Sequence, residues 1–147
     1  MSFSKNANAT MQMADWSETV KADIDEGEGA ERHGVYYPKR GLTLAEASFT
    51  YTGDMEGSST ALYLISYKEG EAPTLAFERF TGTIGGLEGS CVFRTTGTQS
   101  PEAVQGHSEV VPGMGTGQLE SLRGEIELRL AGEAPDGYPV TLSYDVD

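Results

Sequence analysis

The sequence predicts an all-β protein, and specifically a closed antiparallel eight-strand barrel. Short stretches rich in Thr, Tyr, Val, Phe and Leu alternate in polarity from Leu42 onward. Gly residues interrupt them at short, fairly regular intervals, which is typical of an antiparallel barrel or sandwich. About eight such stretches occur and none reads as a long helix, so they suffice to close a small barrel.

The two clearest strands lie near the C-terminal end. In the stretch 125–130 the apolar residues Ile126, Leu128 and Leu130 alternate with charged ones, and Val140 and Leu142 begin the same pattern in 140–146. Period-two alternation predicts that one face of each strand is buried. Six further stretches begin near these residues: Ala7, Ala47, Thr60, Thr74, Gly89 and Glu102.

The length of 147 residues suits a single domain, taken as 1–147, that buries roughly two-thirds of its unfolded surface. The lone Cys91 cannot form an internal disulfide, and its apolar strand predicts a small buried side chain. The first residues lack the apolar run of a signal peptide. The sequence therefore predicts a cytoplasmic protein.

Charge and motif content exclude several classes of partner. Ten Lys and Arg against 23 Asp and Glu give a net charge of -13, which repels nucleic-acid phosphates and anionic lipid. No stretch approaches the roughly 20 apolar residues of a membrane-spanning helix. Two His and one Cys do not make a Cys-rich zinc site, and no C-x-x-C, P-loop or G-x-S-x-G pattern occurs. We therefore expect no nucleic acid, no membrane, no metal and no cofactor.

One long segment, 17–41, departs from the regular spacing. It is acidic and Gly-rich and reads as a loop between the first two strands. Loops of this length are usually functional or disordered, so the segment is either a lid over one barrel mouth or a mobile surface arm. Its Asp23-x-Asp25 start lacks the Gly and Glu that a calcium loop needs.

A repeated pattern, T-G-x-[IL]-x-x-L-x-G, predicts strand register. In the copy 81–89, a turn at Gly85-Gly86 places Ile84 opposite Leu87. The same register places Glu78 opposite Phe93 and Phe80 opposite Cys91, with all four side chains pointing inward. Glu78 is then a carboxylate in an apolar lumen. Its neighbour Arg79 points outward unless a bulge exchanges the two.

The second copy, 116–124, predicts another hairpin, with its turn at Glu120-Ser121 and Leu119 opposite Leu122. Alternate inward positions then fall on Gly113, Gly115 and Gly117, which either let the strand coil so that the barrel closes or leave room for a ligand. Pro112 interrupts the strand, so the direction of His107 stays open.

These residues carry a family resemblance that extends from about Ala7 to Asp147. Its most specific part is the run 110–117 (VVPGMGTG), followed by Leu119, Leu122 and Gly124; Phe77-Glu78-Arg79-Phe80 and Gly86-Leu87-Glu88-Gly89-Ser90 add to it. The sequence resembles a family of small bacterial proteins known only as a domain of unknown function, with a fold similar to the allene oxide cyclase barrel. The resemblance implies an eight-strand barrel and a homo-oligomer, and by analogy a small-molecule pocket.

Two functional hypotheses follow, and neither identifies a reaction. In the first, the lumen binds a small apolar or aromatic molecule with Glu78 as the polar anchor, which predicts a cavity of about 300 Å³ or more that reaches solvent. In the second, side chains fill the barrel and its outer face forms a homo-oligomer without a ligand. The candidate ligand-binding residues are Glu78, Arg79, Phe80, Phe93, Tyr63, Tyr67, His107 and Trp16.

Overall fold

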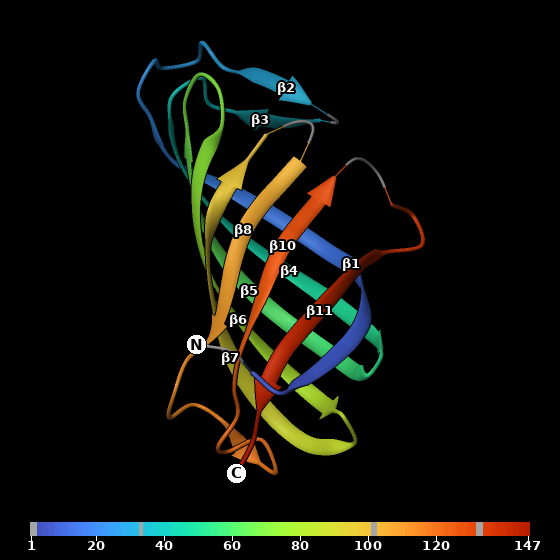
Figure 1. Cartoon of the computed structure of the whole chain (residues 1–147). Helices are drawn as coiled ribbons and strands as arrows, with labels where there is room; N and C mark the ends of the chain where they lie inside the picture. Colours follow the sequence, from blue (N-terminus) through green and yellow to red (C-terminus); the bar gives the residue numbers. More distant parts are fainter. Residues whose placement is uncertain (1–2, 33, 101–102, 132–133) are drawn as a thin grey trace.

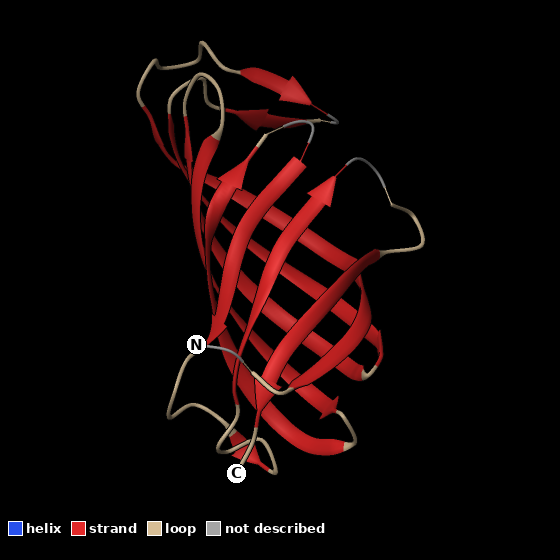
Figure 2. Cartoon of the chain, in the orientation of Figure 1, coloured by secondary structure: helices blue, strands red, loops and turns tan. Residues whose placement is uncertain are grey.

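The computed structural model describes residues 3–32, 34–100, 103–131 and 134–147, and these contain strands and no helix (Figures 1 and 2). Eight strands form an antiparallel sheet that closes on itself, because β6 pairs with both β5 and β7. Their order around the barrel is β6 (Ala72–Ile84), β5 (Met55–Tyr67), β4 (Gly41–Gly53), β1 (Lys5–Asp23), β11 (Tyr138–Asp145), β10 (Arg123–Ala131), β8 (Ala103–Val110) and β7 (Leu87–Gln99). The predicted fold class is confirmed.

The β6–β7 hairpin has the predicted register. Ile84 pairs with Leu87, and Glu78 pairs with Phe93. Gly85 and Gly86 occupy the turn with φ angles of 56° and 83°. Positive φ at both central residues suits the twist of a tight hairpin, and glycine adopts it without a Cβ penalty.

The predicted second hairpin is wrong. Instead of pairing with residues 111–117, β10 pairs with β8, so that Ile126 lies opposite Ser108 and Leu128 opposite Gly106. Pro112 has no N–H for a ladder, and Glu120-Ser121 does not suit the positive φ angles of a two-residue turn. The segment between β8 and β10 therefore leaves the barrel wall.

The segment 111–122 closes one end of the barrel. Its short strand β9 (Thr116–Gly117) pairs with β7, and a turn follows in which the Leu122 N–H donates to the Leu119 carbonyl at 3.1 Å. Both leucines are buried in the main core cluster. The proposed row of inward-facing glycines on a strand here is thus also wrong; Gly97 and Gly106 instead pair across β7 and β8.

The segment 17–41 is not a single loop, because β1 continues to Asp23. Two register shifts, between Met13 and Asp15 and between Val20 and Ala22, interrupt the period-two pattern along β1. The remaining stretch, 24–40, contains a hairpin of β2 (Ala30–Arg32) and β3 (Val35–Tyr37) at one mouth of the barrel (Figure 1). We call 24–40 the mouth hairpin.

Polar contacts hold the mouth hairpin together and connect it to the end of β1. The Arg40 guanidinium donates to both Asp25 oxygens, at 2.9 and 2.7 Å, and the Tyr36 hydroxyl donates to Asp23 Oδ2 at 2.7 Å. Arg40 lowers the pKa of Asp25 by hydrogen bonding and by its charge.

Among the described residues, no helix is long and apolar enough to cross a membrane.

Candidate functional site

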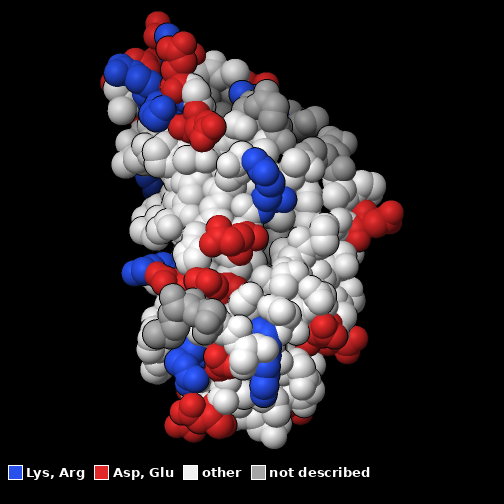
Figure 3. Space-filling model, viewed as in Figure 1, with Lys and Arg blue, Asp and Glu red and all other residues white. Residues whose placement is uncertain are grey.

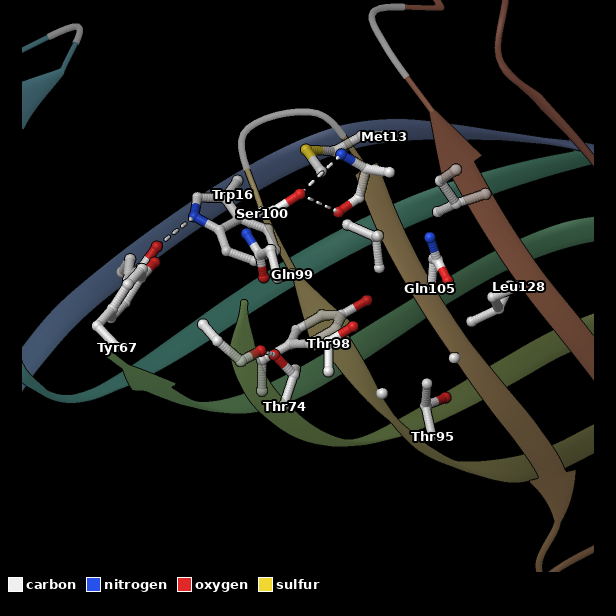
Figure 4. Close-up of a pocket in the computed structure, with 18 of the residues that line it drawn as sticks. Met13, Trp16, Tyr67, Thr74, Thr95, Thr98, Gln99, Ser100, Gln105 and Leu128 are labelled. Atoms are coloured by element: carbon white, nitrogen blue, oxygen red, sulfur yellow. Dashed lines mark hydrogen bonds between the residues drawn. The ribbon is translucent and has the colours of Figure 1, made fainter. Parts of the chain in front are cut away.

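A cavity of about 780 Å³ occupies the lumen toward the mouth hairpin (Figure 4). Glu78 of β6 lies in its wall, and the exposed residues Met13, Arg32 and Lys68 line it as well. Because exposed side chains belong to the lining, the cavity reaches solvent. The main core cluster fills the other end of the barrel, around Met55, Leu119 and the residues they pack against, and a smaller cluster of Ala45, Ile65 and Ala72 packs behind the aromatic residues of the cavity.

One wall of the cavity consists of small residues. Along β7 and β8 the inward positions include Thr95 paired with Ser108 and Gly97 paired with Gly106. The Thr95 and Ser108 hydroxyls are hydrogen-bonded at 2.6 Å. A Cβ on Gly97 would lie 2.1 Å from the Gln105 carbonyl oxygen, so the close approach of these strands requires glycine. The space therefore arises where two neighbouring strands lack large inward side chains.

Aromatic residues form the opposite wall. The ring centroids of Trp16 and Tyr63 are 5.3 Å apart, and those of Tyr37 and Tyr67 are 5.8 Å apart. Tyr37 comes from the mouth hairpin, so that segment contributes to the lining. Figure 4 shows Trp16 and Tyr67 on the side of the cavity across from Leu128. The result is a broad apolar surface with hydroxyl and indole donors at its edges.

A half-buried carboxylate, Glu18, organises this aromatic wall. It accepts hydrogen bonds from Trp16 Nε1 at 3.1 Å, Thr43 Oγ1 at 2.6 Å and Tyr67 OH at 2.7 Å. Burial and the hydrogen bond to Glu18 raise the pKa of Tyr67, which therefore stays a neutral donor. These contacts fix the orientation of the Trp16 and Tyr67 rings.

The deeper carboxyl group, Glu78, is only 9% exposed. Its Oε2 accepts from Tyr51 OH and from Ser59 Oγ, each at 2.5 Å. No Lys, Arg or His among the described residues forms an ion pair with it. Burial raises the pKa of Glu78, and the two hydrogen bonds oppose that rise only in part.

The groups around Glu78 remain protonated. Burial raises the pKa of Tyr63, and the negative charge of Glu78 adds to that rise. The same two causes, in the same order, raise the pKa of the Cys91 thiol to about 12. Cys91 is fully buried in the apolar core, as its strand position predicts. A carboxyl group with a raised pKa among neutral hydroxyl donors can exchange a proton with a bound molecule or share a hydrogen bond with it.

Four of the predicted site residues line the cavity: Trp16, Tyr63, Tyr67 and Glu78. Phe80 and Phe93 point inward as predicted but lie in the packed core, and the cavity lining does not include them.

Arg79 and His107 lie on the outer surface, so their assignment to a luminal site is wrong. Arg79 alternates with the inward Glu78 without a bulge and is exposed. His107 pairs across the sheet with Glu127, contacts its carboxylate, and lies 3.6 Å from the Glu125 carboxylate.

Sequence reasoning missed Glu18, Tyr51 and Ser59. Tyr51 was accessible to it, because Phe49 and Tyr51 alternate with the exposed Thr50. Glu18 was hidden by the extra residue in β1, which shifts the face that the following side chains occupy.

Among the described residues, no group of three His, Cys, Asp or Glu side chains is placed to hold a metal ion.

Comparison with known proteins agrees with this architecture. No curated protein matches the chain. A crystal structure of a protein of unknown function from the DUF3224 family of Shewanella oneidensis MR-1 has a TM-score of 0.70 and 22% sequence identity, and the match covers 97% of this chain and 98% of that one. The model of the family described as "Protein of unknown function (DUF3224)" matches residues 7–142. This chain therefore belongs to the DUF3224 family.

Proposed function

We propose that the protein binds one small, largely apolar or aromatic molecule in the barrel lumen, with Glu78 as its polar anchor. The cavity carries this proposal. Its volume of about 780 Å³ lies within the roughly 300–1,000 Å³ typical of small-molecule sites. Such a volume also argues against the alternative of a barrel filled by its own side chains.

The lining favours a flat ligand with few polar groups. Trp16 and Tyr63 offer ring surfaces, while Leu128 and Val140 lie among the lining residues from β10 and β11. Aromatic and apolar surface of this kind favours stacking and the exclusion of water. An allene oxide cyclase-like barrel, as the sequence resemblance implies, is consistent with this mode of binding.

Glu78 supplies the orientation. Its described hydrogen bonds use Oε2 alone, which leaves Oε1 for a ligand. Tyr51 and Ser59 fix the carboxyl group in one position, so a ligand meets a preorganised partner. A protonated Glu78 donates to a ligand oxygen, and an ionised one accepts from a ligand O–H or N–H.

A pair of matched probes tests the proposal. Naphthalene and 1-naphthol differ by one hydroxyl, and Trp16, the only tryptophan, reports binding by its fluorescence. We expect both probes to quench Trp16 and 1-naphthol to bind about five- to tenfold more tightly, as one hydrogen bond of about 1–1.4 kcal/mol provides. The Glu78→Met variant has a side chain of similar volume without the carboxyl group, and in it the preference for 1-naphthol disappears. In Glu56→Gln, an exposed control on β5, it persists.

An occluding variant separates the cavity from the anchor. Leu128→Phe adds volume to the lining and is expected to weaken both probes together, with circular dichroism unchanged. If neither probe changes the fluorescence of Trp16 in the unaltered protein, the binding proposal is refuted. An equal preference for 1-naphthol in Glu78→Met refutes the role of Glu78 alone.

A further inference from the structure

The outer face of β4, β5 and β6 carries a continuous apolar patch. Outward positions on these strands normally hold polar residues, because they contact water. Here large apolar side chains occupy six of them, and each is between 37% and 55% exposed. We call this set the outer apolar face: Leu42, Leu44, Leu62, Leu64, Leu75 and Phe77.

Strand register makes the patch contiguous. Leu64 lies opposite Leu44 on one side and Leu75 on the other, while Leu62 lies opposite Phe77. The side of the barrel over β8, β10 and β11 differs, because Lys, Arg, Asp and Glu are spread across it (Figure 3). Among the described residues, none of the large apolar side chains that are exposed lies on β7, β8, β10 or β11.

Opposite charges flank the patch on the same row. Across the sheet, Glu46 of β4 pairs with Leu62, Leu62 with Phe77, and Phe77 with Arg94 of β7. A two-fold axis that runs parallel to the strands, midway between β5 and β6, places β4 of one copy over β7 of the other. Glu46 then comes within reach of Arg94 of the partner subunit, and the leucines of β5 cover Phe77 of the partner subunit.

We propose that two copies of this chain form an isologous dimer through the outer apolar face. This proposal is independent of ligand binding, because none of the six residues lines the cavity. Arg94 already forms an ion pair with Glu109, and its guanidinium keeps further donors for a second carboxylate.

The area of the patch is sufficient for such a contact. If a fully exposed large apolar side chain presents about 200 Å², the six residues expose on the order of 500 Å² together. That value lies near the upper end of the roughly 300–600 Å² of the largest patch on a typical monomer. With the flanking charged and hydroxyl residues it approaches the roughly 800 Å² that each partner buries in a standard interface.

Sedimentation velocity with charge-swap variants tests the dimer. At about 50 µM the unaltered chain is expected to sediment with the mass of two chains. Leu62→Glu is expected to sediment as a monomer with an unchanged circular dichroism spectrum, whereas Met114→Glu, an equally exposed control away from this face, remains a dimer.

The charges distinguish a two-fold contact from general stickiness. Glu46→Arg alone and Arg94→Glu alone each place like charges together and should raise the dimer dissociation constant at least tenfold. The double variant restores opposite charges and should recover most of that loss. A monomeric unaltered chain, an assembly of another size, or a double variant weaker than both single ones overturns the proposal, and a monomer leaves the face to a different protein partner.

Discussion

Replacing Tyr51 with Phe removes one of the two hydroxyls that hold the buried Glu78 carboxyl group. The ring itself remains, and it packs edge-on against Phe80 with centroids 5.4 Å apart. The substitution therefore removes the 2.5 Å hydrogen bond to Glu78, together with a weaker contact of the same hydroxyl with Met11 Sδ at 3.3 Å. It also leaves Ser59 as the one remaining described donor to Glu78.

The expected cost depends on pH. The pKa of Glu78 in the folded protein lies above its ordinary value of 4.5, so its contribution to stability is fully present below pH 4.5 and is lost as the pH rises through the folded pKa. Loss of a donor to the charged form raises that pKa further. We expect Tyr51→Phe to lower the free energy of unfolding by about 1 kcal/mol when Glu78 is neutral and by about 1.5–3 kcal/mol when it is ionised.

Urea unfolding of both proteins between pH 4 and pH 9 measures this difference. Most other titrating groups contribute equally to the two proteins, so they cancel in the comparison. Ser59→Ala should show the same trend, because it removes the second donor. A cost for Tyr51→Phe that stays constant over this pH range, or that shrinks as the pH rises, refutes the account of Glu78.

Three further outcomes follow from the structure. Leu119→Ala, which opens the closed end of the barrel, should lower the free energy of unfolding by about 2–5 kcal/mol, whereas Met114→Ala in the same segment should change it by less than about 0.5 kcal/mol; comparable losses contradict the role of Leu119 in closing that end. The Cys91 thiol, with a pKa of about 12, should react with a disulfide reagent at pH 8 only after unfolding in urea, and equal rates in native and unfolded protein contradict its burial. Asp25→Asn should speed amide hydrogen exchange in residues 24–32 at pH 7, because the lowered pKa of Asp25 keeps it ionised and paired with Arg40 at that pH. Unchanged exchange argues against a role of this ion pair in ordering the segment.

The parts of the fold that sequence alone predicted are those with strong local rules. Gly85-Gly86 specifies a tight turn, and once the turn is fixed, alternation places Glu78 on the inner face. The second hairpin failed because Leu119 and Leu122 look like a cross-strand pair. They instead pack into the barrel end, and which non-local surface they cover is not encoded in local spacing.

The candidate site was predictable only where alternation is uninterrupted. Tyr63 and Glu78 follow simple period-two strands, and both reach the lumen. In β1, by contrast, the extra residue between Met13 and Asp15 shifts the pattern, so Glu18 read as part of an acidic loop. The direction of His107 could not be predicted, because Pro112 interrupts the strand and the alternation beyond it cannot be extended back to His107.

The closure of the barrel has a consequence for its folding. β1 lies between β4 and β11, and its pairing with β11 places Lys5 opposite Tyr144 and Met11 opposite Tyr138. Contacts between such distant positions are slow to form, since a long length of chain must be ordered before they provide any stabilisation. During synthesis, β1 therefore presents an unpaired edge until the last strand leaves the ribosome, and that interval is when self-association through bare strand edges competes with folding.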